Sequence, residues 1–342
     1  MKRKGIAALA TATVGLGAGL VAQRSVVQRR RRTDPEAGEA YGQRRGHSSR
    51  TIMLDDGAKI FIEEAGPKSA RRGAVFMHGS ALRTDLWHYQ LAGLGDHRLV
   101  FYDLRGHGLS QPKGDADFSI ETLARDLETV IENAGLDEVV LVGHSIGGMI
   151  ALEYCRAHLD QLGDSVKGVI LLNTTHHPVG TVIGGAGMAR FERLTRRPLD
   201  AIGSRSDYVQ RLRKIIKPSD SIFMMVSAAA FGPGASAKQI DFTYDMLAET
   251  EADVIFDLLK SYRDFEVTDH LGEITVPALV VGGDRDRITV LSASEHLARE
   301  LPKAELEVLR GCGHMSMLER HRELNRLMTS FLDDVLDEEP NV

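Results

Sequence analysis

Apolar, strand-like runs recur along most of the chain, and amphipathic, helix-like stretches separate them. The apolar runs end near residues 79, 103, 144, 175, 284 and 314. The helix-like stretches cover residues 84–94, 119–134, 146–159, 292–301 and 317–335. Strands that are apolar throughout are typical of a parallel sheet buried on both faces. The alternation therefore predicts an α/β fold with a mostly parallel, doubly wound sheet.

Two segments of the folded part depart from this alternation. Residues 51–66 form two short alternating runs around Asp56-Gly57, which predicts a β-hairpin. Residues 176–272 hold helical patterns and no strand pattern, and a stretch this long between two core strands favours a helical cap over a loop. We predict a core domain of residues 51–175 and 273–338, with a cap, or lid, inserted at 176–272.

Composition excludes several classes of function. The chain of 342 residues has a formal net charge of −6, which argues against nucleic acid as a partner. Its 2 cysteines exclude a disulfide framework and a zinc cluster. Residues 184–187 are glycine-rich but lack a preceding strand, so no dinucleotide loop is predicted. We expect neither a cofactor nor a metal ion.

The first fifty residues differ from the rest in charge, with a balance of +8 against −14 for residues 51–342. An uncharged run at residues 5–22 lies between basic clusters, and three interpretations of it are open: a single membrane anchor, a cleaved secretory signal, or a loosely helical tail. We favour the anchor, hence membrane association through residues 5–22, with secreted and cytoplasmic locations as alternatives. Residues 33–50 are expected to be a flexible linker. The sequence does not indicate an oligomeric state.

The segment from Gly143 to Gly147 carries the sharpest chemical signal. It reads G-H-S-I-G, follows an apolar strand and precedes a helical stretch, which is the context that a nucleophile elbow requires. Such a turn strains the backbone of the serine and lifts its hydroxyl to the start of the helix, where developing negative charge is favoured. Ser145 is therefore the candidate nucleophile.

A serine nucleophile needs a histidine base and a carboxylate that orients the base. In this type of fold both follow later strands, in the order serine, acid, histidine. Asp284 and Asp286 follow one later strand, and His314 follows the last. We favour Asp286 as the acid because it stands further beyond the strand end, and we keep Asp284 as the alternative. His314 is the candidate base.

The ordered set of motifs resembles the α/β-hydrolase family, which includes esterases, lipases, enol-lactonases and cofactor-free haloperoxidases. The motifs are HGS at 78–80, DLRGHGLS at 103–110, GHSIGG at 143–148, the acid loop at 284–290 and GCGH at 311–314. The resemblance covers residues 51–335, and it also extends to actinobacterial-type members with an N-terminal apolar extension. It departs from the family pattern at Val290, where proline is common.

The resemblance implies further roles for residues near the nucleophile. The backbone N–H groups of Ser80 and Ile146 would form the oxyanion hole. His78 would brace the oxyanion loop, and the charged turn at 103–107 would be structural. Trp87, Met224 and Phe231 are candidates for lining the substrate site, with ordinary packing as the alternative for each.

We predict a serine hydrolase that cleaves small-molecule carboxylic esters with small or medium apolar groups through an acyl-enzyme. Haloperoxidase-like, perhydrolase or lactonase activity with the same residues is an alternative. A ligand-binding module with residual hydrolase activity is another. A serine at position 145 argues against the dehalogenase and epoxide-hydrolase branches, which use aspartate there.

Overall fold

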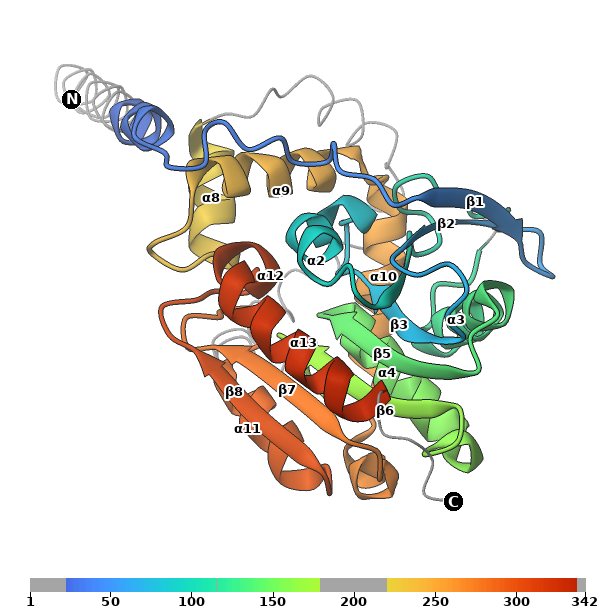
Figure 1. The fold of residues 1–342 in the computed structure, drawn as a ribbon. Coiled ribbons are helices and arrows are strands. Elements are labelled where there is room, and N and C mark those ends of the chain that lie inside the picture. Colours follow the sequence, from blue (N-terminus) through green and yellow to red (C-terminus); the bar gives the residue numbers. More distant parts are fainter. Residues whose placement is uncertain (1–22, 115, 179–219, 337–342) are drawn as a thin grey trace, which may run out of the picture.

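The computed structural model describes residues 23–114, 116–178 and 220–336. At its centre lies an eight-stranded sheet with the strand order β1-β2-β4-β3-β5-β6-β7-β8 (Figure 1). The strands are β1 Ser48–Met53, β2 Lys59–Ala65, β3 Arg72–Met77, β4 Arg98–Tyr102, β5 Glu138–His144, β6 Val166–Leu172, β7 Ala278–Gly283 and β8 Ala304–Leu309.

Only β2 runs against the other strands of the sheet. β1 pairs antiparallel with β2, and β2 pairs antiparallel with β4. The strands from β4 to β8 are parallel neighbours in the sheet. The predicted α/β fold, with its hairpin and its mostly parallel sheet, is therefore confirmed. Because the six parallel strands share one direction, their carboxyl ends lie along a single edge of the sheet, where ligands bind in folds of this kind.

Helices cover both faces of the sheet. α2 (His88–Gly93) and α13 (His321–Leu336) lie on one face, while α3 (Ile120–Ala134), α4 (Ile146–Ala157) and α11 (Leu291–Glu300) lie on the other (Figure 1). Shorter helical turns are η1 Thr84–Trp87, η2 Leu159–Gln161, η3 Thr268–Glu273 and α12 Ser316–Glu319.

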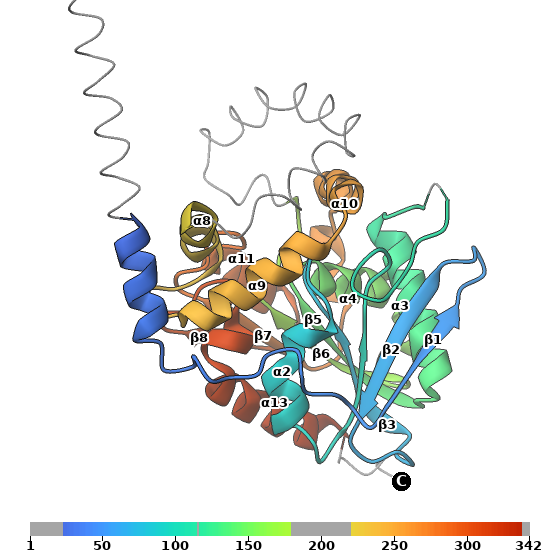
Figure 2. The ribbon, with the colours of Figure 1, turned by 90° about the horizontal axis from the view of Figure 1, so that it is seen from above.

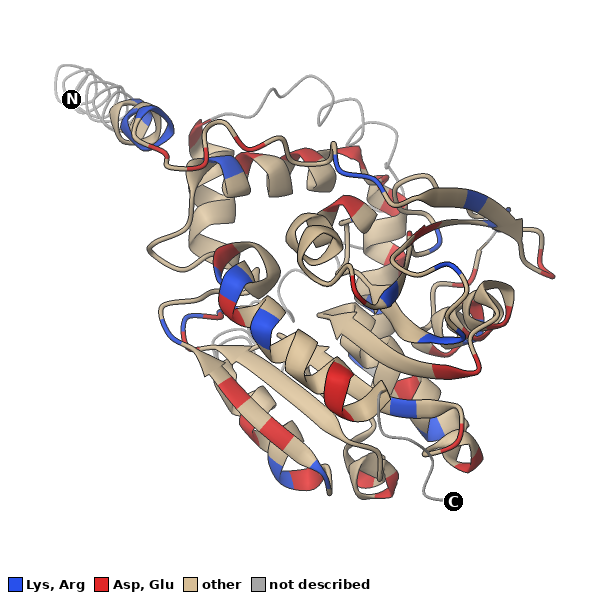
Figure 3. Ribbon diagram, viewed as in Figure 1, with Lys and Arg blue, Asp and Glu red and all other residues tan. Residues whose placement is uncertain are grey.

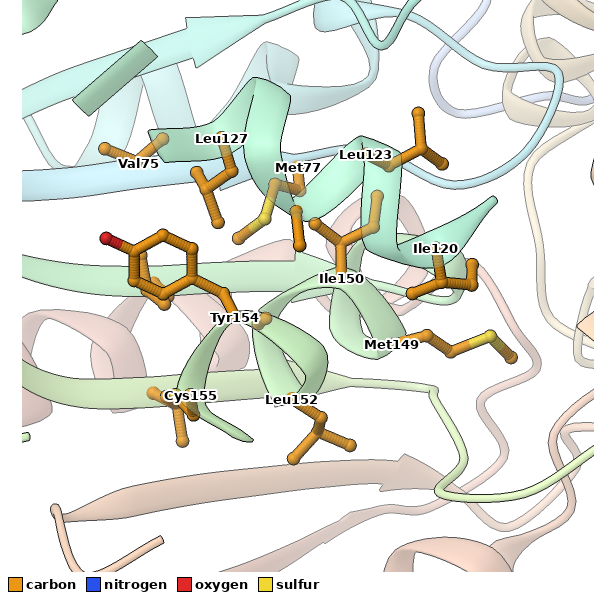
Figure 4. Close-up of a cluster of buried hydrophobic side chains, with 14 of the residues drawn as sticks. Val75, Met77, Ile120, Leu123, Leu127, Met149, Ile150, Leu152, Tyr154 and Cys155 are labelled. Carbon is orange, nitrogen blue, oxygen red and sulfur yellow. The ribbon is translucent and has the colours of Figure 1, made fainter. Parts of the chain in front are cut away.

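Burial on both faces explains why the parallel strands are apolar throughout. In β3, Val75 and Met77 point to the α3 and α4 side, while Ala74 and Phe76 point to the α2 and α13 side. Successive strand side chains alternate between faces, so a strand covered on both sides needs an apolar residue at every position. Figure 4 shows Val75 and Met77 in one cluster with helix residues on their face, among them Leu127 from α3 and Ile150 from α4.

Three helices of the predicted cap lie in the described part of the chain. They are α8 (Asp220–Ala230), α9 (Ala237–Glu249) and α10 (Ala252–Asp264). Figure 2 shows α9 running between α8 and α10, above the end of the sheet. α9 begins with a capping box, because the Ser236 side chain accepts from the backbone of Gln239 and the Gln239 side chain accepts from the backbone of Ser236. Residues 179–219 lie outside the described residues, and the division into core and cap stays a prediction.

The N-terminal region corrects two expectations. Residues 33–47, expected to be part of a flexible linker, make specific contacts: Glu39 accepts from His88, and Tyr41 stacks on Phe242 at 4.7 Å between ring centroids. The predicted membrane anchor is also wrong, since no helix among the described residues combines the length and apolarity needed to cross a bilayer. The run at 5–22, on which that prediction rested, lies outside the described residues.

Candidate active site

Ser145 stands at a sharp turn between β5 and α4. Its backbone has φ +55° and ψ −119°, a left-handed conformation that few residues other than glycine adopt. The Ser145 backbone N–H donates to the Leu172 carbonyl at 3.0 Å, and the Thr174 hydroxyl donates to the Ser145 carbonyl at 2.6 Å. The end of β6 and the segment that follows it thus hold both backbone polar groups of the serine.

Both glycines of the G-H-S-I-G segment are required because the surrounding backbone leaves no room for a Cβ atom. A Cβ added at Gly143 would lie 2.3 Å from the Gly147 carbonyl oxygen, and one added at Gly147 would lie 2.2 Å from the Met77 carbonyl oxygen. Both contacts are with backbone, which cannot move aside. The motif therefore needs glycine at these two positions because β3, the turn and the start of α4 approach one another closely.

The structure brings His314 to Asp286. The His314 Nδ1 lies 2.9 Å from the Asp286 Oδ2, and both side chains are almost fully buried. Because a carboxylate oxygen only accepts, Nδ1 carries the proton and Nε2 keeps its lone pair. Asp284 turns elsewhere: its Oδ1 accepts from the Gly311 backbone N–H at 2.6 Å, where it supports the loop before His314.

Two residues that the sequence analysis did not single out hold Asp286. The Asp286 Oδ2 accepts from the Asn173 amide at 2.9 Å and from the Thr289 hydroxyl at 2.8 Å. Its Oδ1 accepts from the backbone N–H groups of Ile288 and Thr289. Burial raises the pKa of Asp286, but His314, Asn173 and Ile288 together outweigh burial and hold that pKa below its ordinary value. The carboxylate is therefore charged at neutral pH.

Asn173 could have been found from its position. It follows β6 directly, at the same edge of the sheet as Ser145, and a polar residue at the end of an apolar strand is a signal for that edge. Asn173 also has φ +47°, which asparagine tolerates better than most residues. Its amide donates to the Gly313 carbonyl at 3.2 Å as well, so it joins the acid loop to the histidine loop.

The backbone around His314 is held from several directions. His144, next to Ser145, places its Nε2 3.0 Å from the His314 carbonyl oxygen, and the two rings lie 4.7 Å apart. Burial lowers the pKa of His144 far below its ordinary value, and the nearby His314 lowers it further. His144 is thus neutral and donates through Nε2. This contact connects the nucleophile turn to the base.

The expected oxyanion loop follows β3 and is tied to the turn after β4. The His78 Nε2 accepts from the Leu104 backbone N–H, and the His107 Nε2 accepts from the Ala81 backbone N–H, each at 3.0 Å. His78 of the oxyanion loop thus accepts from the turn after β4, and His107 of that turn accepts from the oxyanion loop. The two hydrogen bonds hold the segments together. Ala81 has φ +58°, so this loop is a second strained turn beside the elbow.

The two candidate oxyanion donors lie on these turns. Ile146 is the first residue of α4, where backbone N–H groups have no partner within the helix. Ser80 lies between Gly79 and Ala81, and a Cβ added at Gly79 would come within 2.7 Å of the His144 Nδ1. The oxyanion loop thus packs against the residue that precedes the nucleophile.

The three candidate substrate-lining residues lie in different surroundings. Trp87 is 1% exposed and packs edge-on against Phe76 in the core, so its side chain offers no surface to a substrate, which corrects that expectation. Phe231 follows α8 and is also buried, and its backbone lies next to Gly313, one residue before His314. Met224 is half-buried on α8. Among the described residues, no group of His, Cys, Asp and Glu is arranged to hold a metal ion.

Comparisons with known proteins identify relatives of this chain. A family model described as alpha/beta hydrolase fold matches residues 75–321. The chain is 29% identical over 291 residues to the non-heme chloroperoxidase CPO-A1 of Kitasatospora aureofaciens, covering 81% of this chain and 97% of that protein. It is 25% identical over 283 residues to the AB hydrolase superfamily protein YisY of Bacillus subtilis, covering 82% and 97%.

Solved structures of other proteins also match most of this chain. A structure described as Est816, an N-acyl homoserine lactone degrading enzyme, matches with a TM-score of 0.64 and 25% identity, covering 82% of this chain and 100% of that one. A thermophilic esterase from Thermogutta terrifontis matches with a TM-score of 0.67 and 21% identity, covering 84% and 99%. At that identity the second likeness concerns the fold alone.

Proposed function

Since the chain belongs to the α/β-hydrolase family, we propose that it is a serine hydrolase that cleaves carboxylic esters with small or medium apolar groups. The observation that carries the proposal is the buried pair of His314 and Asp286, 2.9 Å apart, at the sheet edge where the strained turn presents Ser145. A histidine held in this way has its Nε2 lone pair free to take a proton from a serine hydroxyl.

In the first half of the reaction the Ser145 Oγ attacks the ester carbonyl carbon while His314 Nε2 takes the hydroxyl proton. The carbonyl oxygen becomes an oxyanion, which the backbone N–H groups of Ser80 and Ile146 stabilise. The tetrahedral intermediate then collapses, the bond to the alcohol oxygen breaks, and His314 returns the proton to the departing alcohol. Asp286 stabilises the imidazolium that exists between these two steps.

In the second half, water attacks the acyl-enzyme carbonyl and gives a proton to His314. Collapse breaks the bond to the Ser145 Oγ, which recovers that proton, and the acid leaves. The half-buried Met224 of α8, the helix that ends at the histidine loop, supports a preference for apolar groups.

The first test is covalent labelling with a fluorophosphonate probe, followed by hydrolysis of p-nitrophenyl esters of increasing chain length. We expect labelling of the wild type and none of Ser145→Ala. The control is Ser165→Ala, because Ser165 directly precedes β6 and so lies at the opposite edge of the sheet. A folded wild type that neither reacts with the probe nor hydrolyses any ester would refute the proposal and favour a ligand-binding module.

A second activity has specific support. One relative is named a chloroperoxidase and one structural neighbour is described as a lactone-degrading enzyme. Peracid formation would use the same acyl-enzyme, with hydrogen peroxide replacing water as the attacking group. Assays of ester and lactone hydrolysis with and without peroxide separate these reactions, and each should be lost in Ser145→Ala.

A further inference from the structure

The N-terminal strap, defined here as residues 23–47, lies along the outside of the cap helices. It starts with a helical stretch at residues 23–32 beside α8 and α9, then continues past α2 to β1 (Figures 1 and 2). The family model begins at residue 75, so the strap lies outside the region that this chain shares with it.

Two arginines of the strap hold the cap helices. The Arg30 guanidinium donates to the Ser227 hydroxyl at 2.9 Å and to the Ala235 carbonyl at 3.0 Å. Arg31 makes a bidentate pair with Asp241 of α9, at 2.9 and 2.8 Å, and an ion pair with Asp220 at 3.5 Å. Figure 3 shows these opposite charges on the strap helix and on the neighbouring cap helices.

The same two guanidinium groups also meet over one aromatic ring. The guanidinium carbons (Cζ) of Arg30 and Arg31 lie 5.3 and 5.1 Å from the ring centroid of Phe223, a buried residue of α8. This geometry is that of a cation–π contact. The strap therefore fixes α8 at its start, in its middle and at the turn that follows it.

The other end of α8 is fixed to the candidate base. The His314 backbone N–H donates to the carbonyl of Ala230, the last residue of α8, at 2.8 Å. Glu319 accepts from the backbone N–H groups of both Gly232 and Gly313, at 2.8 and 2.9 Å. A Cβ added at Gly313 would lie 2.6 Å from the Gly232 nitrogen, so the end of α8 and the histidine loop are packed backbone to backbone.

We propose that Arg30 and Arg31 are positioning residues for His314, acting through α8. Arg30 binds Ser227, one helical turn before Ala230, and Ala230 binds the backbone of His314. The inference rests on the proposed function, in which His314 is the base. A displacement of about 1 Å at a catalytic group can cost about a hundredfold in rate. Half-exposed ion pairs add little to stability, so loss of the strap contacts should lower kcat far more than thermal stability.

The test compares two double variants of the full chain that remove equal charge from the same helical stretch. Arg30→Ala/Arg31→Ala removes the contacts with the cap, whereas Arg29→Ala/Arg32→Ala removes two arginines that are exposed. For p-nitrophenyl acetate we expect the first variant to lose about 10- to 100-fold in kcat. KM should change by less than about threefold, and the rate of fluorophosphonate labelling should fall in parallel with kcat. The control should stay within about twofold of the wild type.

A charge reversal separates positioning from general disruption. Arg31→Asp should lower kcat, and adding Asp241→Arg should restore most of it by rebuilding the pair in the opposite sense. Equal kcat in the two double variants would overturn the inference, as would failure of the charge reversal to rescue activity. Either result, with Ser145-dependent hydrolysis intact in the control variant, would leave the proposed function standing.

Discussion

His107 makes folding stability depend on pH in a defined window. Its Nε2 accepts the Ala81 backbone N–H, so its Nδ1, 3.0 Å from the Arg105 carbonyl, carries the proton. Burial lowers the pKa of His107 from 6.5 to about 4. Between these values the unfolded chain binds a proton that the native state does not bind. The contribution of His107 is therefore present above about pH 6.5 and is lost as the pH falls towards 4.

The magnitude follows from the size of the pKa shift. One pKa unit corresponds to about 1.4 kcal/mol, so the full shift is worth about 3 kcal/mol below pH 4. Between pH 7 and pH 5 the same two values give a loss of about 2 kcal/mol in the free energy of unfolding. His176, with a pKa lowered to about 4 by burial and by its histidine neighbours, adds to the loss in the same window. A difference between variants is needed to isolate His107.

The assay is urea unfolding of the wild type and of His107→Gln at pH 7 and at pH 5. A neutral glutamine cannot take up the proton, so the loss of unfolding free energy between the two pH values should be about 2 kcal/mol smaller in the variant. His270→Gln serves as the control, because nearly half of the His270 side chain lies in solvent, and it should behave like the wild type. Losses that agree within about 0.5 kcal/mol in wild type and His107→Gln would refute the reasoning.

Three further outcomes are expected. Asp286→Asn should lower kcat by about 10³- to 10⁴-fold while Asp284→Asn stays within about tenfold, and steady-state ester kinetics that reverse this order would exchange the two roles. Asn173→Leu should cost about 1.5–3 kcal/mol in urea unfolding because it removes a donor from a buried carboxylate, and an unchanged midpoint would contradict this. Gly147→Ala should cost more than about 4 kcal/mol, since the new Cβ would meet the Met77 carbonyl, and a thermal midpoint equal to that of the wild type would show that the turn can relax.

The sequence by itself predicted the α/β fold and the nucleophile turn, because both depend on local requirements. A strand buried on both faces has to be apolar at each position, as Val75 and Phe76 show on opposite faces of β3. The turn at Ser145 needs glycine at positions 143 and 147, where backbone approaches too closely for a Cβ. Such requirements act on residues that are close together in the sequence, so they can be recognised without knowledge of the rest of the fold.

The sequence leaves both Asp284 and Asp286 as candidates for the acid, since both follow the same strand. Only the folded loop shows that Asp284 turns to the Gly311 backbone while Asp286 meets His314. The sequence likewise leaves open whether Trp87 lines the substrate site or packs in the core, and the structure shows that its side chain packs in the core. In both cases the direction of a side chain depends on loop geometry and packing, which residue spacing does not encode.

The supporting contacts of the site were decided by tertiary structure alone. Asn173 reaches Asp286 across 113 positions of the chain, and Arg31 reaches Asp241 across 210. Nothing in the local pattern around Arg31 distinguishes it from the exposed Arg29 and Arg32, so the sequence offers no partner for it. A charged helix face has the same sequence pattern whether it is exposed to solvent or contacts a distant carboxylate. Only the tertiary structure determines which carboxylate lies beside it.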